Sequence, residues 1–403
     1  MAVTFEELEN IRNIDNSACV DFLSLAVWPL INPTPGWSGI MQKTQQGEYP
    51  GKSSVHFLPM IDMNASDLSC VYSTLLFVCK EAGRYQRTPI LTFDQPLFWK
   101  AMMIVWNEPK DSKLRSMVIR LGAFHTEMSF LGCIGHIMEG SGLQEMLEII
   151  YATNTVPHIL KGKAIARAIR GHFLIDTALH CLLGSEVFGF PLPTSSSEYQ
   201  DQGKQTSLDF ENSQILKGAS ELYAQLLDGT TSAELIRNHS VFRQLQISFQ
   251  EILDQKRENR TARLWIQYSE MIQILRTFIR TERTGDWNLH LQALHDMLPY
   301  FAAAGHNLYT KSCYVYLMMM KNLETDHPDV HQAFQNGLHV IRRSERYWAG
   351  LVYRFDNRTS FDAKCKDSWW FDQGPWHWRK SESTLASFHA IMCRSKSSHA
   401  RSY

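Results

Sequence analysis

Two short apolar runs, each ending in a polar or turn residue and followed by a helix-like segment, constrain the fold of this chain most. Residues 90–93 (ILTF) form a strand-length run, with Asp94 at its carboxyl end and Pro96 where the first turn of a helix needs no N–H. Residues 117–121 (MVIRL) form a second run, closed by Gly122. The order strand, helix, strand, helix predicts a parallel, right-handed α/β core.

The ends of these two strands supply the first candidate site. Parallel strands bring their carboxyl ends to one edge of a sheet, and the sites of open α/β sheets collect at that edge. Asp94 and His125 are therefore the best candidates for catalytic residues. The alternative is structural: Asp94 caps the helix that follows it, because Asp is a preferred N-cap residue, and His125 bonds a backbone carbonyl.

The same pattern extends upstream. Residues 55–61 predict another strand, and residues 62–85 predict a helix that is entered through Asn64 or Ser66. Four apolar residues of this helix are spaced for one buried face: Leu68, Val71, Leu75 and Val78.

Composition narrows the class of protein. A net charge of −1 over 403 residues lacks the basic excess of an autonomous DNA-binding protein, so any DNA contact needs a local patch. The eight cysteines are scattered without a C-x-x-C pair, and the acidic N-terminus does not read as a signal peptide. No apolar run approaches the roughly 18 to 20 residues that span a bilayer. We therefore expect a soluble intracellular protein, nuclear or cytoplasmic, with reduced thiols and no membrane partner.

The sequence divides into five parts. Residues 1–50 are a poorly assigned N-terminal segment, residues 51–190 are the predicted α/β core, and the polar residues 191–212 are a predicted linker. Residues 213–350 have helical spacing throughout. Residues 351–403 hold four of the eleven tryptophans without a helical or strand period, which predicts a non-native or disordered tail. A nucleic-acid-binding tail, with tryptophans stacking on bases, is the alternative.

Two further groups of residues bear on metal and nucleic-acid binding. The sixteen histidines, notably His125, His136, His306 and His327, lack the tight spacing of zinc motifs, so a zinc site is not expected. A basic stretch is a candidate for gripping a phosphate backbone, with a solvated helix face as the alternative. It consists of Lys161, Lys163, Arg167 and Arg170.

Several long blocks resemble a widespread family of transposon-derived metazoan proteins. The blocks include PGWSGIMQ (35–42), FLPMIDMNASD (57–67), LTFDQPLFWKA (91–101), RLGAFHTEMSFLGCIGHIMEGSGL (120–143), HILKGKAIARAIRGHFL (158–174) and a block from TERTGDW to NLYTKS (281–312). The resemblance covers about residues 20–350. The layout of the α/β part is similar to the ribonuclease-H-like core of Mutator-like and hAT-like transposases, which implies a partial ribonuclease-H-like parallel sheet with helices, followed by a helical domain.

The resemblance implies a metal-dependent site for DNA strand transfer. Asp94 matches the second metal-binding carboxylate and His125 the histidine at the end of the next strand, while Glu282 is the nominee for the third carboxylate. Such a site would hold Mg²⁺ or Mn²⁺, because two hard cations activate the nucleophile and stabilise the leaving oxygen. The first carboxylate is expected in a segment before PGWSG, so the chain looks truncated. A salt bridge to Arg280 or Arg283 is the alternative role of Glu282.

The resemblance ends near Gly350. Reading the codons of residues 354–378 one nucleotide later can give DLIIEQVLMRNVKTVGGLTKGRGIG, which matches how relatives continue after the block equivalent to RRSERYWAGL. Residues from about 351 onward are therefore interpreted as an out-of-frame readthrough. The chain is expected to be a remnant of a transposase-like protein without activity of its own. The alternatives are a non-enzymatic module that binds protein or nucleic acid, and an unrelated hydrolase that uses Asp94 and His125.

Overall fold

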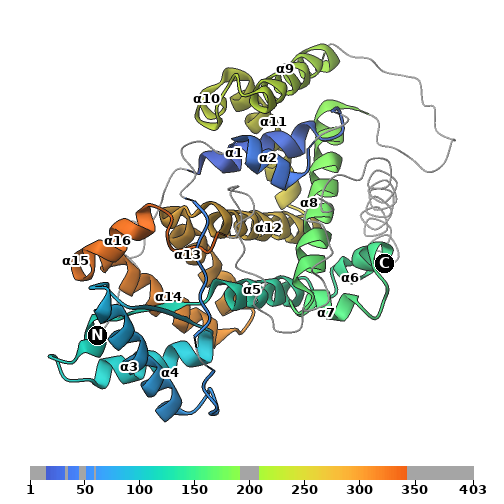
Figure 1. Ribbon diagram of the computed structural model, residues 1–403. Helices are drawn as coiled ribbons and strands as arrows, with labels where there is room; N and C mark the ends of the chain where they lie inside the picture. The colour runs from blue at the N-terminus through green and yellow to red at the C-terminus, as the bar shows by residue number, and fades with distance from the viewer. Residues whose placement is uncertain (1–14, 32–34, 45–50, 59, 191–207, 343–403) are drawn as a thin grey trace. The chain divides into compact units, whose positions relative to one another are not determined.

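The computed structural model describes a mostly helical chain (Figure 1). The described residues are 15–31, 35–44, 51–58, 60–190 and 208–342. The predicted tail at 351–403, residues 1–14 of the N-terminal segment and residues 191–207 of the predicted linker lie outside them. The last residues of the predicted linker instead begin a helix, α9 (Leu208–Asp228).

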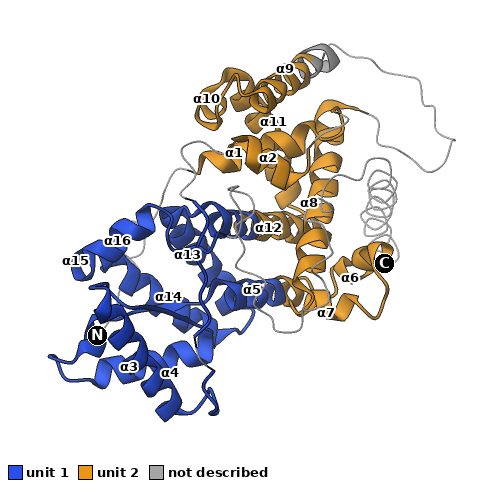
Figure 2. Cartoon of the chain, in the orientation of Figure 1, with its two compact units in different colours: residues 1–13, 48–133, 275–355 blue, residues 14–47, 134–274, 356–403 orange. Residues whose placement is uncertain are grey.

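Contacts divide the chain into two compact units, each built from separate segments (Figure 2). Unit 1 comprises residues 1–13, 48–133 and 275–355, and unit 2 comprises residues 14–47, 134–274 and 356–403. The divisions at 133 and 274 fall inside two helices, α5 (Ala123–Ile137) and α12 (Arg260–Thr284), and not at the predicted linker. Sequence order alone therefore does not give the composition of either unit.

Unit 1 contains the strands predicted at 90–93 and 117–121. Its complete elements are α3 (Leu68–Arg84), β1 (Ile90–Phe93), α4 (Gln95–Asn107), the 3-10 helix η2 (Lys113–Ser116), β2 (Val118–Leu121), α13 (Trp287–Ala303), α14 (Asn307–Lys321), α15 (Leu323–Asp326) and α16 (Pro328–Gln335). Strands β1 and β2 pair in parallel, with Phe93 opposite Leu121, which confirms the predicted parallel pairing. All four residues of β2 are buried, whereas β1 alternates between exposed and half-buried residues.

The strand predicted at 55–61 is wrong. Its described residues are irregular, and the side chain of Phe57 is 86% exposed. Within the described residues the sheet contains β1 and β2 alone. An apolar run forms a strand only when a neighbouring strand pairs with its backbone, and neither β1 nor β2 pairs with this one.

Local capping chemistry sets the ends of the helices around this sheet. Asp67, and not Asn64 or Ser66, caps α3, because its carboxylate accepts a hydrogen bond from the N–H of Ser69. Helix α4 begins after Asp94 and carries Pro96 in its first turn, as predicted.

Close backbone approach explains why a glycine ends β2. The N–H of Gly122 donates to the carbonyl oxygen of Phe93 at 2.7 Å, and a Cβ atom at Gly122 would lie 2.9 Å from that oxygen. Any larger residue would therefore push the two strand ends apart.

Unit 2 is helical throughout its described residues. Its complete helices are α1 (Asn16–Val27), α2 (Trp37–Thr44), α6 (Leu143–Ile150), α7 (Val156–Leu160), α8 (Ile165–Phe188), α9, α10 (Ala233–Asn238) and α11 (Ser240–Arg257). Helices α1, α8, α9 and α11 share an apolar core in which Phe22 meets Phe249 edge-on, with ring centroids 5.1 Å apart. None of the described helices is both long and apolar enough to cross a bilayer.

Candidate functional site

The two residues predicted at the strand ends have separate local surroundings. Asp94 lies directly after β1, and its Oδ1 accepts a hydrogen bond from the N–H of Leu97 at 3.1 Å, which is the capping role given above as its alternative. His125 lies in the first turn of α5, where its side chain is exposed and its ring meets that of Phe124 edge-on. Among the described residues, Asp94 belongs to no group of three potential metal ligands.

The third predicted residue, Glu282, belongs to a different constellation. Its carboxylate, the imidazole of His290 and the imidazole of His339 place their nearest ligand atoms within 4.8 Å of one another. All three residues are in unit 1, and their exposed fractions are 2%, 1% and 6%. We call them the Glu282–His290–His339 cluster.

The atoms of this cluster have few partners. Glu282 Oε1 forms an ion pair with His290 Nδ1 at 2.7 Å. Among the described residues, His290 Nε2 has no hydrogen-bond partner, and the ring of His339 interacts with the backbone of Phe334. Polar atoms with few partners are costly in a protein core, which marks the cluster as unusual.

Two glycine turns bring the three side chains together. Gly285 has φ +84° and joins the end of α12, which carries Glu282, to the start of α13, which carries His290. Gly337 has φ +71° and follows α16, two residues before His339. A Cβ atom on Gly285 would lie 2.8 Å from the Cα of Gly337, so the two turns touch through positions that only glycine fits.

The guanidinium group of Arg342 fixes these turns to one another. Its Nη1 donates to the carbonyl oxygen of Gly337 at 2.6 Å, and its Nη2 donates to the carbonyl oxygen of Thr284 at 3.0 Å. The cluster is thereby built on a rigid double turn.

Aromatic rings and a second buried arginine enclose the cluster. The ring of Trp287 stacks on His290 with an interplanar angle of 15°, and it meets His339 at a centroid distance of 4.9 Å. Arg120 of β2 donates from Nη1 to the carbonyl oxygen of His339 at 2.7 Å, and its guanidinium lies 5.0 Å from the ring centroid of Phe334. Burial, together with the positive charge of Arg120, lowers the pKa of His339 well below its ordinary value. His339 is therefore neutral at pH 7, which leaves a ring nitrogen lone pair available as a ligand.

Sequence reasoning nominated Glu282 but missed His290 and His339. Glu282 and His290 are separated by a helix end and a turn, and His339 comes from a distant part of the chain. No short motif connects the three. Gly285 and Gly337 are visible in the sequence as possible turns. Their positive φ values, which show that the chain reverses there, appear only in the structure.

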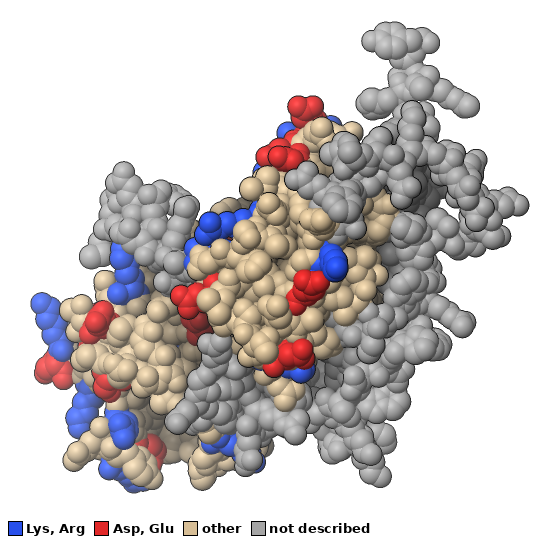
Figure 3. All heavy atoms as spheres, turned by 90° about the horizontal axis from the view of Figure 1, so that it is seen from above, with Lys and Arg blue, Asp and Glu red and all other residues tan. Residues whose placement is uncertain are grey.

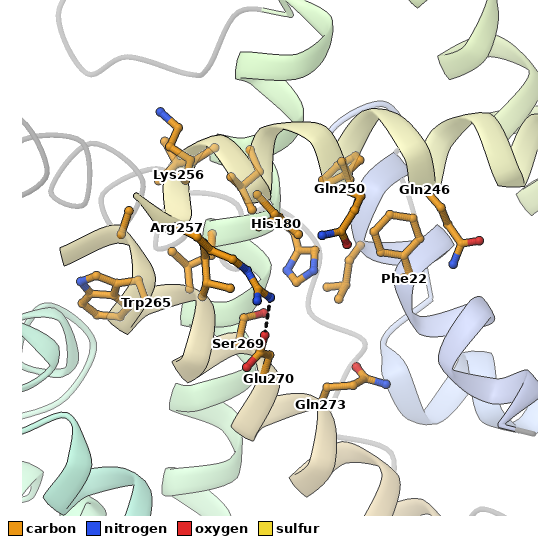
Figure 4. A pocket seen from close by; sticks show the side chains of 18 of the residues that line it. Phe22, His180, Gln246, Gln250, Lys256, Arg257, Trp265, Ser269, Glu270 and Gln273 are labelled. Atoms are coloured by element: carbon orange, nitrogen blue, oxygen red, sulfur yellow. Dashed lines mark hydrogen bonds and ion pairs between the residues drawn. The ribbon is translucent and has the colours of Figure 1, made fainter. Parts of the chain in front are cut away.

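Unit 2 contains a second feature of interest, a groove between α1, α8, α11 and α12 (Figure 4). The groove has a volume of about 440 Å³ and we call it the four-helix groove. Its apolar lining includes Phe22, Leu179, Leu183, Phe249, Leu253, Trp265 and Ile266. Ion pairs Lys256–Glu186 (2.5 Å) and Arg257–Glu270 (2.7 Å) also line it, as do the side chains of Gln246, Gln250 and Gln273.

The groove contains a serine and a histidine, but they are not arranged as a nucleophile and its base. The hydroxyl group of Ser269 donates to Asp176 Oδ1 at 2.6 Å, and His180 Nδ1 lies 2.9 Å from the carbonyl oxygen of Asp176. A catalytic serine would instead be hydrogen-bonded to the histidine. Ser269 and His180 are therefore not paired as nucleophile and base.

The predicted basic stretch lies around the start of α8. Lys161, Lys163 and Arg167 are exposed, while Arg170 is half-buried. Ala164, the N-cap residue of α8, makes no side-chain capping bond. Over the described surface that faces the viewer in Figure 3, basic and acidic side chains are interspersed, which agrees with the net charge of −1.

Comparison with known proteins identifies a family for this chain. A family model with the description Domain of unknown function (DUF8702) matches residues 36–356. No curated protein and no solved structure matches the chain.

Proposed function

The chain belongs to the DUF8702 family of domains of unknown function, and we propose that it acts by binding a partner through the four-helix groove, as a transposase-derived module without strand-transfer activity. The observation that carries this proposal is the groove itself. Its volume of about 440 Å³ lies within the roughly 300 to 1,000 Å³ typical of ligand pockets. Its mixture of aromatic rings and a few polar groups is also typical of them.

The chemistry of the lining indicates the class of partner. The apolar surfaces of Phe22, Phe249 and Trp265 favour an apolar side chain, while the amide groups of Gln246 and Gln250 can bond backbone or polar groups beside it. An amphipathic helix of another protein offers both features, because apolar anchors on one face are flanked by polar groups.

The proposed origin has its own support. The order strand, helix, strand, helix over residues 90–137 and the parallel pairing of β1 with β2 agree with part of a ribonuclease-H-like core. The proposed loss of strand transfer is supported by the separate surroundings of Asp94, His125 and Glu282. One carboxylate caps a helix, the histidine is exposed and the other carboxylate is buried against His290.

The binding proposal can be tested with the fluorescent probe 1-anilinonaphthalene-8-sulfonate (ANS), whose rings are apolar and whose sulfonate can pair with Lys256 or Arg257. We expect saturable binding of one probe per chain, with a change in tryptophan fluorescence from Trp265. Ala18→Phe should weaken this binding at least about tenfold, because the new ring enters the groove from α1 and displaces the probe.

The matched control is Ala166→Phe, which places the same ring at an exposed position of α8 that does not line the groove. It should leave the probe affinity unchanged. Circular dichroism should show that wild type and Ala18→Phe are both folded. If the two proteins then bind the probe equally well, the groove is not the binding site.

A second candidate function is contact with a DNA backbone through Lys161, Lys163 and Arg167. It is favoured by their exposure around the first turn of α8, since N–H groups without a capping side chain attract anions. Each cation replaced by glutamine should reduce the slope of log affinity against log salt by about 1. Fluorescence polarisation with a labelled duplex measures this slope, and an unchanged slope in the triple variant would exclude the contact.

A further inference from the structure

We propose that Glu282, His290 and His339 form a binding site for a divalent transition-metal ion, with two imidazole nitrogens and one carboxylate oxygen as ligands. The three residues lie in unit 1, whereas the residues that line the four-helix groove lie in unit 2. Two histidines and one carboxylate are a ligand set that protein sites use for Zn²⁺ and for non-haem Fe²⁺.

The spacing of the ligand atoms suits a single ion. Metal–ligand bonds of about 2.0 to 2.2 Å in a tetrahedral site place ligand atoms about 3.4 Å apart. The atoms of the cluster lie within 4.8 Å of one another, and Glu282 Oε1 and His290 Nδ1 are 2.7 Å apart. Small rotations of the three side chains would equalise these separations around a central ion.

The buried polar atoms give a second reason for a ligand. Among the described residues, His290 Nε2 has no hydrogen-bond partner, and Glu282 Oε1 contacts His290 Nδ1 in a buried ion pair. A bound cation would use one lone pair from each residue of the cluster, so it would satisfy three buried polar atoms at once. Tyr316 lies beside the cluster, where its ring meets that of His290 edge-on at 6.4 Å.

The surroundings hold the ligands in place and limit the affinity. Trp287 stacks on His290, and the Gly285 and Gly337 turns fix the backbone on either side. Arg120 bonds the carbonyl oxygen of His339, so its positive charge lies near the site and opposes a second cation. Glu282 supplies the compensating negative charge. Replacement of Arg120 by methionine should therefore raise the metal affinity.

The competing interpretation is a metal-free contact, in which Glu282 Oε1 and His290 Nδ1 satisfy each other at 2.7 Å. The two interpretations differ in what the chain does after treatment with a chelator. A metal site takes up one ion per chain with a defined coordination sphere, whereas a metal-free pair does not.

The test uses Co²⁺ and Zn²⁺ on the chelator-treated full-length protein. We expect one Co²⁺ per chain with the intense visible absorption of a four- or five-coordinate ion, and displacement of that absorption by one equivalent of Zn²⁺. His339→Gln and Glu282→Gln should each lose more affinity than the roughly 10- to 100-fold that removal of an outer-shell partner costs. His158→Gln, which changes an exposed histidine of unit 2, is the matched control and should bind Co²⁺ like wild type.

A measurement on the wild-type chain covers the case in which the cluster variants do not fold. X-ray absorption at the zinc edge should show two imidazole ligands and a low coordination number. Co²⁺ uptake without visible absorption, fractional uptake that His158→Gln lowers, or a zinc edge without imidazole scattering would each overturn the proposal.

Discussion

At the scale of single residues, Gly285 does more than end a helix. Its positive φ lets the chain reverse between α12 and α13, and its missing side chain makes room for Gly337 and for the guanidinium group of Arg342. The positions of Glu282 and His290 therefore depend on a residue that has no functional group.

Replacing Gly285 with alanine should destabilise the protein by about 2 kcal/mol or more, because an L-residue is strained at this φ and its Cβ would meet Arg342 Nη2 at 2.4 Å. Urea unfolding followed by circular dichroism measures the change. Gly83→Ala is the matched control, since Gly83 lies in α3 with no atom within 4 Å of the added Cβ, and it should gain about 0.5 to 1 kcal/mol. Equal effects of the two substitutions would contradict this account of Gly285.

Substitutions of Asp94 can distinguish its two proposed roles, a helix cap and a metal ligand. If its carboxylate acts as the cap of α4, Asp94→Ala should lose about 1 kcal/mol of stability, whereas Asp94→Asn should lose a few tenths at most, because an amide oxygen can also accept the Leu97 N–H. Thermal unfolding in the presence and absence of Mg²⁺ makes the comparison. A Mg²⁺-dependent stabilisation that is present in wild type and absent in Asp94→Asn would support the metal-binding prediction for Asp94.

At the scale of elements, the two strands differ in how they are covered. Strand β2 packs against α4 and α14 and is buried along its length, whereas β1 leaves Ile90 39% exposed. The sequence gives both strands the same apolar character, so only packing distinguishes them.

Ile119→Ala in β2 should therefore cost about 3 to 4 kcal/mol, since the side chain of Ile119 has no exposed area and its removal leaves a cavity. Ile90→Ala in β1 removes the same atoms from a partly solvated site and should cost about 1 kcal/mol. The prediction is tested by measuring the free energy of unfolding of each variant and comparing its loss relative to wild type. Similar losses would indicate that β1 is covered in solution by a partner.

At the scale of the whole molecule, both units contain buried histidines that resist protonation. In unit 2, burial lowers the pKa of His172 to about 4 from an ordinary value of 6.5, while its Nδ1 lies 2.9 Å from the hydroxyl oxygen of Tyr268. In unit 1 the pKa of His339 is shifted in the same direction. The unfolded chain then binds more protons than the folded chain between pH 6.5 and 4.

The stabilisation that these buried histidines contribute should therefore be fully present above pH 6.5 and should be lost as the pH drops towards 4. The fall in the pKa of His172 corresponds to about 3 kcal/mol, at roughly 1.4 kcal/mol per pH unit. His172→Gln should be less stable than wild type at pH 7 but should show a flatter decline between pH 6.5 and 4. Urea unfolding across this range tests the prediction, and parallel declines for the two proteins would show that His172 does not contribute.

The parts of the fold that the sequence predicted are those that local chemistry specifies. The apolar run at 90–93, the capping residue Asp94 and Pro96 lie within one stretch, and the structure confirms the strand and the start of α4 there. The run at 55–61 has similar composition, but a strand also needs a neighbour, and its described residues have none. Composition alone could not distinguish the two runs.

The sequence by itself determined the pair of parallel strands with their intervening helix, the helical character of residues 213–335, and Glu282 as a carboxylate worth attention. Only the tertiary structure decided that Glu282 meets His290 and His339 and that four helices leave a groove. The physical reason is the range of the interactions. Caps, turns and periodicity depend on residues a few positions apart, whereas the cluster and the groove depend on side chains that chain reversal brings together from distant segments.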